Sequence, residues 1–417
     1  MQKKIYSVFI NTILFLAVSL LVYGAMEWAF PRVFTKIFPM NMATKFDEFD
    51  GVWPLFQSSK RSYLPKNYIA LAGDSYAMGM GDAMYEPIPN AREPRFGSAH
   101  TIQDMTARDV ITFGQPGSGS IRGAISNPIS GLRYLHSAVD KNFPSPAWLL
   151  IYFYEGNDLT ENWMYYEQTF LTNHTAVDYE NPQVFDQYIQ DVALGRQRLY
   201  LAANAVTWQK QLFFYRFARR IFAETMLGKK FYRGKYPNEL GLIYIPQSRW
   251  VPRKVDQPIN HALIGGKTVP LPNNLQGPSM DLSQEQLVQT VGTFAKSLAW
   301  SRAHFPDTQF AVVFVPSVLS SYQLVGDNVD AQNFFSDNST QFKVAELEQR
   351  HQWIEKEIAR VAKEQGVPFV NTTSDIRAAA QDETVHGPRD WNHFSRKGYE
   401  VLGQSVVRQL PSLKAEK

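Results

Sequence analysis

One serine and one acid–histidine pair in this sequence have the types and spacing that nucleophilic catalysis needs. Ser75 follows Gly73 and Asp74 directly after an apolar run, and His393 lies three positions after Asp390. A serine hydroxyl is a weak nucleophile until an adjacent base takes its proton. An acid three residues from a histidine in a turn lies on the same side and can fix its tautomer. We therefore predict Ser75 as nucleophile, His393 as general base and Asp390 as the group that orients His393.

Acyl transfer to such a serine also needs hydrogen-bond donors at the oxygen that becomes negative. The backbone amides of Ser75 and Gly117 and the side-chain amide of Asn157 are predicted to form this oxyanion hole, because Gly117 and Asn157 also follow apolar runs. Glu155 is expected on a solvated loop, with a substrate contact as the alternative. The competing interpretation of Ser75 is that its side chain only caps a helix.

These residues come together only if the segments before them are parallel strands. Apolar runs predict strands at 68–72, 107–113, 148–154, 309–315 and 367–370. Helices are predicted at 121–139, 283–304 (with a Ser283/Gln286 capping box), 344–365, 375–381 and 395–410. Strands alternating with helices favour a parallel sheet covered on both faces, with ligands bound at the carboxyl ends of the strands.

The N-terminus has the composition of a membrane anchor. Residues 5–25 carry no charge and follow two lysines, so we predict a cytoplasmic N-terminus and a transmembrane helix within residues 1–26. A cleaved signal peptide is the alternative. Residues 27–66 are expected to form a juxtamembrane connector with little regular structure, and residues 67–417 would then lie outside the cytoplasm, in the periplasm or at the cell surface.

The alternation of strands and helices stops in residues 159–278, which we interpret as a large insertion. Within it, residues 195–235 are rich in Arg, Lys and aromatic residues and almost free of acids. Two interpretations are kept for this stretch: a solvated helix with an aromatic core face, and an amphipathic helix on an anionic membrane surface.

Composition excludes some classes of function. The chain has 417 residues and a formal net charge of +3, which is too small to indicate nucleic-acid binding. It contains no cysteine, so disulfides, thiolate metal sites and a cysteine nucleophile are excluded. Neither a zinc-protease histidine pair nor a phosphate-binding loop motif is present.

The candidate residues fall into four short sequence blocks, and these blocks together resemble the SGNH (GDSL-like) hydrolase family over about residues 67–410. The match consists of Gly73-Asp74-Ser75, Gly117, Asn157 and the pair Asp390/His393, in the family's order. Tyr76 departs from the pattern, because a leucine usually follows the serine. The resemblance implies a three-layer, flavodoxin-like α/β fold with about five parallel strands, no metal and no organic cofactor.

The resemblance leaves three functions open. The first is an extracytoplasmic serine esterase that cleaves acyl esters, with acetyl groups on cell-surface glycans as the expected substrate. The second is an O-acyltransferase that moves an acetyl group onto an envelope polysaccharide, which would involve partner proteins of polysaccharide modification. The third is a non-catalytic binding module of the envelope. With each of them, the charge-free N-terminal segment predicts a membrane association through its helix.

Overall fold

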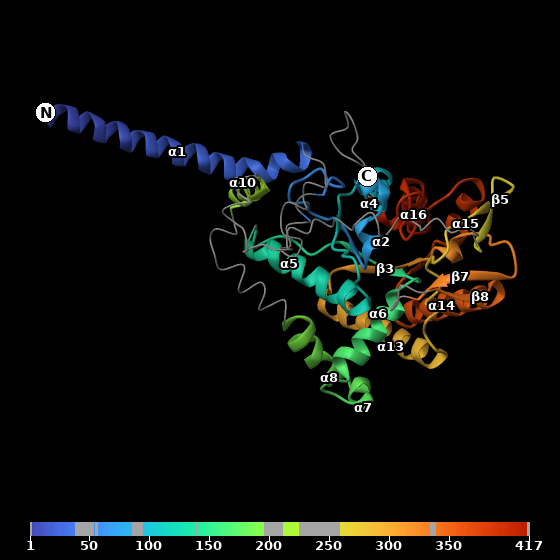
Figure 1. Ribbon diagram of the computed structural model, residues 1–417. Coiled ribbons are helices and arrows are strands. Elements are labelled where there is room, and N and C mark those ends of the chain that lie inside the picture. The colour runs from blue at the N-terminus through green and yellow to red at the C-terminus, as the bar shows by residue number, and fades with distance from the viewer. Residues whose placement is uncertain are drawn as a thin grey trace.

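A five-stranded parallel sheet forms the centre of the protein (Figure 1). The structure, a computed structural model, describes residues 2–37, 54, 57–85, 95–138, 140–195, 212–224, 259–333 and 339–414. The strands lie in the order β2-β1-β3-β6-β9. Their bounds are β1 Ile69–Ala72, β2 Val110–Thr112, β3 Trp148–Tyr154, β6 Gln309–Val315 and β9 Phe369–Asn371. All five predicted strands are present and pair in parallel, so their carboxyl ends meet at one edge.

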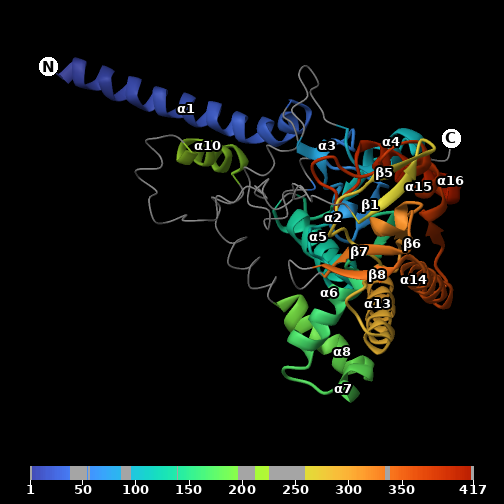
Figure 2. The ribbon, with the colours of Figure 1, turned by 45° about the vertical axis from the view of Figure 1, so that its right-hand side comes forward.

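Helices cover both faces of this sheet. Side chains along β3 alternate between two separate cores, with Leu149 and Ile151 in one and Leu150 and Tyr152 in the other. One core is closed by α5 (Asn127–Ala138), α13 (Gln284–His304) and α14 (Val344–Glu364). The other is closed by α4 (Ser98–Thr106), α15 (Thr373–Asp382) and α16 (Arg396–Gln409). The protein therefore has a mixed α/β architecture with the sheet as its middle layer (Figure 2).

The predicted helices are present with small changes at their ends. Ser283 accepts a hydrogen bond from the Gln286 backbone, and the Gln286 side chain accepts one in return, so the predicted capping box is confirmed. The helix predicted at 121–139 begins as a π-helical turn, η4 (Ile121–Ser126), and continues as α5. Four shorter elements are α2 Ser75–Met78, α3 Asp82–Tyr85, η8 Leu319–Ser321 and η9 Pro411–Leu413.

Helix α1 (Gln2–Ile37) projects from the body of the protein (Figure 1). Its segment Val8–Phe30 is long and apolar enough to cross a membrane, and none of that segment is buried in the protein. The expectation of little regular structure after residue 26 is wrong for the part up to Ile37, because the helix continues through Pro31 without a break. Residues 38–53, 55 and 56 of the predicted connector lie outside the described residues.

The predicted insertion is helical at its start and contains a small hairpin near its end. It begins with α6 Asp158–Tyr165, η5 Tyr166–Phe170, α7 Ala176–Glu180, α8 Pro182–Tyr188 and η6 Ile189–Ala193. Aromatic rings of this part join the core beneath α5 and α13. Residues 196–211 and 225–258 lie outside the described part. The carboxyl half of the chain also contains two antiparallel strand pairs that were not predicted. They are β4–β5 (His261–Ile264, Lys267–Pro270) and β7–β8 (Asn328–Gln332, Ser339–Lys343).

The basic aromatic stretch contains a helix that packs against α1. Helix α10 (Phe213–Glu224) lies beside α1 in both views (Figures 1 and 2). The Glu27 carboxylate accepts the backbone N–H groups of Phe214 (2.9 Å) and Tyr215 (2.8 Å), and the Phe30 ring lies 5.1 Å from that of Phe217. The insertion therefore returns to the end of α1 that is closer to the sheet.

A buried ion pair holds the end of β3 against α14. Glu155 Oε1 lies 2.6 Å from Nδ1 of His351, and Glu155 Oε2 accepts the backbone N–H of Ser317 at 2.8 Å. The predicted solvated position of Glu155 is wrong, because its side chain is fully buried. Burial opposes ionisation of both groups, but mutual attraction outweighs it, so the pKa of Glu155 is lowered and that of His351 is raised.

Glu155→Gln is predicted to lower the free energy of unfolding by about 3 kcal/mol, measured by urea denaturation. A glutamine has one acceptor oxygen and no negative charge, so it cannot accept from both the protonated His351 imidazole and the Ser317 amide. Glu364→Gln, which removes an exposed partner of Arg360, is the matched control and should cost less than about 1 kcal/mol. Equal effects of the two variants would contradict this role.

The cost of Glu155→Gln should depend on pH in a defined direction. A lowered Glu155 pKa stabilises the fold above the ordinary glutamate pKa and ceases to do so as the pH falls through the lowered value. A raised His351 pKa stabilises the fold below the ordinary histidine pKa and ceases to do so as the pH rises through the raised value. The difference between wild type and variant should therefore be largest between about pH 4.5 and 6.5.

Candidate active site

The turn after β1 presents the Ser75 hydroxyl at the carboxyl edge of the sheet. Asp74, not Ser75, caps helix α2, because the Asp74 carboxylate accepts the Tyr76 backbone N–H at 2.8 Å. The interpretation of Ser75 as a helix cap is therefore wrong. The Ser75 hydroxyl lies 3.4 Å from Asp74 Oδ2 and is also available to a second partner that is distant in the sequence.

That second partner is His393, and the predicted three residues form one hydrogen-bonded chain. Ser75 Oγ lies 2.9 Å from His393 Nε2, and His393 Nδ1 lies 2.6 Å from Asp390 Oδ2. Because Asp390 is the acceptor at Nδ1, the proton of the neutral ring lies there and Nε2 accepts the Ser75 hydroxyl proton. This arrangement lets the imidazole remove the serine proton while the carboxylate stabilises the imidazolium that results.

The charges around His393 favour its protonated form. Burial lowers the pKa of His393, but the Asp390 carboxylate, followed by Asp74 and Asp82, outweighs burial, so the net shift is upward. Burial raises the pKa of Asp74 to about 6 against the opposing effects of the Tyr76 amide and His393. The imidazole is therefore a stronger base than an ordinary histidine, as proton removal from serine requires.

The contacts of Tyr76 account for a tyrosine at the position where the sequence pattern leads us to expect a leucine. Its ring stacks on that of Tyr154 with centroids 4.0 Å apart and lies 5.5 Å from the His393 ring. Its hydroxyl donates to the carbonyl oxygen of Asn392 at 2.8 Å. Tyr76 thus joins the serine turn to the residue before His393, which a leucine cannot do by hydrogen bonding.

Asp82 is a site residue that the sequence analysis missed. Its two carboxylate oxygens each accept a backbone N–H at 2.8 Å, one from Arg389 and one from Asp390. It therefore holds the loop that carries Asp390 and His393 against helix α3. An acid seven positions after Ser75 carries no signal of this role in the sequence, because the loop that it binds lies more than 300 residues away.

The two other predicted oxyanion donors meet at one carboxyl group. Gly117 adopts a left-handed backbone conformation (φ 64°), and a Cβ atom there would lie 3.6 Å from Glu161 Oε1. Asn157 precedes α6, and its Nδ2 donates to Glu161 Oε1 at 3.4 Å. Gly117 and Asn157 thus lie on either side of Glu161, which the sequence analysis did not single out.

Buried acids surround this region. Burial, followed by the charges of Asp74 and Glu161, raises the pKa of Asp158 well above its ordinary value.

The described parts of the chain contain no group of three or more His, Asp or Glu residues that could hold a metal ion.

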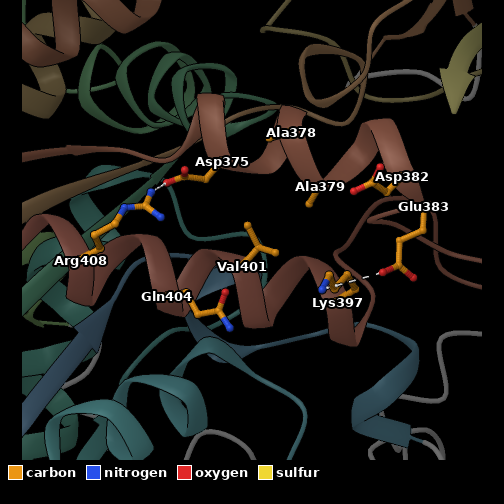
Figure 3. Close-up of a pocket in the computed structure, with 9 residues that line it drawn as sticks. All are labelled: Asp375, Ala378, Ala379, Asp382, Glu383, Lys397, Val401, Gln404 and Arg408. Carbon is orange, nitrogen blue, oxygen red and sulfur yellow. Dashed lines mark hydrogen bonds and ion pairs between the residues drawn. The ribbon is translucent and has the colours of Figure 1, made fainter. Parts of the chain in front are cut away.

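A surface hollow of about 310 Å³ lies elsewhere, between α15 and α16 (Figure 3). Two ion pairs cross the hollow, Arg408 with Asp375 and Lys397 with Glu383. None of its lining residues is among the candidate site residues. The hollow is therefore separate from the Ser75–His393–Asp390 chain.

Comparison with known proteins adds no family assignment. The sequence matches no protein-family model, and a search of curated proteins finds no significant match. The geometry of the site is therefore the basis for any functional conclusion.

Asp390→Asn is predicted to lower the pKa of His393 below its wild-type value, because the variant removes the adjacent negative charge that opposes the effect of burial. The measurement is an NMR pH titration of selectively labelled histidines in the full chain. Asp382→Asn, at an exposed acid on α15, is the control. An unchanged His393 titration in Asp390→Asn would contradict the electrostatic coupling of the pair.

Proposed function

We propose that the protein is a serine acyl hydrolase that forms an acyl-enzyme on Ser75. The observation that carries this proposal is the continuous hydrogen bonding from Ser75 Oγ through His393 to Asp390, at 2.9 and 2.6 Å. His393 removes the hydroxyl proton as Ser75 attacks the acyl carbon, and returns it to the leaving alcohol. Water activated by the same imidazole then releases the carboxylic acid.

The surroundings of the site support the same proposal. The amides of Ser75 and Gly117 and the side chain of Asn157 serve as the oxyanion hole. Among parallel strands, the order β2-β1-β3-β6-β9 corresponds to the flavodoxin-like order, which agrees with the resemblance to SGNH hydrolases. Helix α1 is long and apolar enough to cross a membrane, which supports a location at a membrane. The substrate class that we propose is acyl esters, with acetylated glycans of the cell envelope as the expected members.

Ser75→Ala is predicted to abolish hydrolysis of para-nitrophenyl acetate, with a loss of about 10⁴-fold or more in kcat. The unfolding midpoint should stay close to that of wild type, because the substitution removes a single oxygen. Ser62→Ala, at an exposed serine, is the matched control. Full activity in Ser75→Ala would refute the proposal.

An oligosaccharide acceptor added to the same assay separates hydrolysis from acyl transfer. Hydrolysis predicts that nitrophenol release does not need the acceptor and that no acetylated sugar appears. Release only in the presence of the sugar, with acetyl groups on the sugar, would identify an O-acyltransferase that uses the same acyl-serine.

Asn157→Ala is predicted to lower kcat about 10²-fold with little change in KM, because an oxyanion donor acts mainly in the transition state. Steady-state kinetics with the same ester measure both constants. Asn173→Ala, at an exposed position, is the control. An effect confined to KM would remove Asn157 from the oxyanion hole.

A further inference from the structure

Glu161 is a buried carboxyl that the proposed reaction has not yet used. Its side chain extends from α6 between the two loops that carry Gly117 and Asn157. Oε1 accepts the Asn157 amide, whereas Oε2 is buried without a hydrogen-bond partner. Oδ1 of Asn157 is also buried and unpartnered. Unpaired buried polar atoms are costly, and a negative charge on this carboxyl would lack the hydrogen bonds that stabilise a buried carboxylate.

The charges that face Glu161 come from three elements. Asp74 lies in the turn after β1, Asp158 precedes Glu161 on α6, and Arg122 lies on η4. The Arg122 guanidinium is bonded to the carbonyl oxygen of Gly117 at 2.8 Å. Asp281 is bonded to the neighbouring Thr160, at 3.0 Å.

Burial and negative neighbours make the ionised form of Glu161 unfavourable. Burial, followed by the charge of Asp74, raises the pKa of Glu161 to about 8, against the smaller opposing effect of Arg122. At neutral pH the carboxyl therefore keeps its proton. The group beside Asn157 and Gly117 is then a neutral acid and adds no negative charge to the oxyanion hole.

We propose that Glu161 is a positioning residue of the oxyanion hole that works only while protonated. Oε1 holds the Asn157 amide, and the neutral carboxyl does not repel the negative oxygen of the tetrahedral intermediate. This inference rests on the proposed acyl-serine reaction. Loss of the proton places a negative charge next to that oxygen and draws the Asn157 amide toward the carboxylate.

Two pH limits for the reaction follow from this assignment. On the acid side, protonation of His393 removes the general base. On the alkaline side, ionisation of Glu161 weakens the oxyanion hole, so kcat falls about tenfold for each pH unit above about 8. Because the active form carries the proton, activity declines as the pH rises.

Glu161→Gln is the decisive variant, because glutamine has the shape of the protonated acid and cannot ionise. The experiment measures kcat for para-nitrophenyl acetate from pH 6 to 10 with the full chain in detergent, after subtraction of the Ser75→Ala background. Glu161→Gln should keep kcat within about threefold of wild type at pH 7 and remain active at alkaline pH. Glu161→Ala should lose about tenfold at every pH. Glu167→Gln, at an exposed glutamate further along the chain, should keep the wild-type profile.

Three kinetic results would overturn the inference: no alkaline decline in wild type, the same decline in Glu161→Gln, or equal losses in Glu161→Gln and Glu161→Ala at pH 7. Absence of any Ser75-dependent turnover would instead refute the proposed function. Infrared spectroscopy then tests the protonation directly: at pH 7 the wild-type spectrum minus that of Glu161→Gln should contain a carboxylic-acid C=O band, because the contribution of Asp158 is common to both proteins and cancels. An identical band in both proteins would refute the protonated Glu161.

Discussion

The hydrogen bond between Ser75 and His393 joins the first strand of the sheet to the last loop before α16, and the candidate site depends on it. Three sets of contacts hold its two ends in place. Asp74 caps the serine turn, and Tyr76 bonds the residue before His393. Asp82 binds the loop that carries Asp390. Because β1 and β3 pair in parallel, the turn before α6 lies at the same edge of the sheet as the turn that carries Ser75.

Electrostatics divides the acids of this edge into two groups. Asp390 interacts directly with His393 and raises its pKa, so its charge supports the base. Asp158 and Glu161 are buried without a positive partner of comparable strength, and their pKa values rise. The site therefore contains a carboxylate that contacts a basic imidazole beside buried acids with raised pKa values, and the difference follows from which carboxyl group contacts a basic group rather than from residue type.

Much of this arrangement could be predicted from the sequence, because the signals were local. Continuous apolar runs located β3 and β6 at their observed bounds, and Ser283 with Gln286 located the start of α13. The Asp390/His393 spacing predicted their contact, since both lie in one turn. The extension of α1 to Ile37 was missed because the prolines in the stretch that follows suggested irregular structure.

Other features could not be predicted because they depend on long-range packing. Glu155 looks like a loop residue until His351 of α14 is placed against it. Asp82 and Glu161 lie in segments with no motif of their own, and their roles arise from loops that fold onto them. The hairpin β7–β8 alternates only weakly between buried and exposed side chains, so its pattern gave no strand signal.

Reaction of the full chain with a fluorophosphonate, followed by mass spectrometry of the digested protein, tests the central claim most directly. Such a reagent bonds covalently to a serine whose hydroxyl is activated by a neighbouring base. An activated Ser75 predicts one modified peptide, with the label on Ser75, and strongly reduced labelling in His393→Gln. Labelling of a different serine, or equal labelling of Ser75 with and without the imidazole, would contradict it.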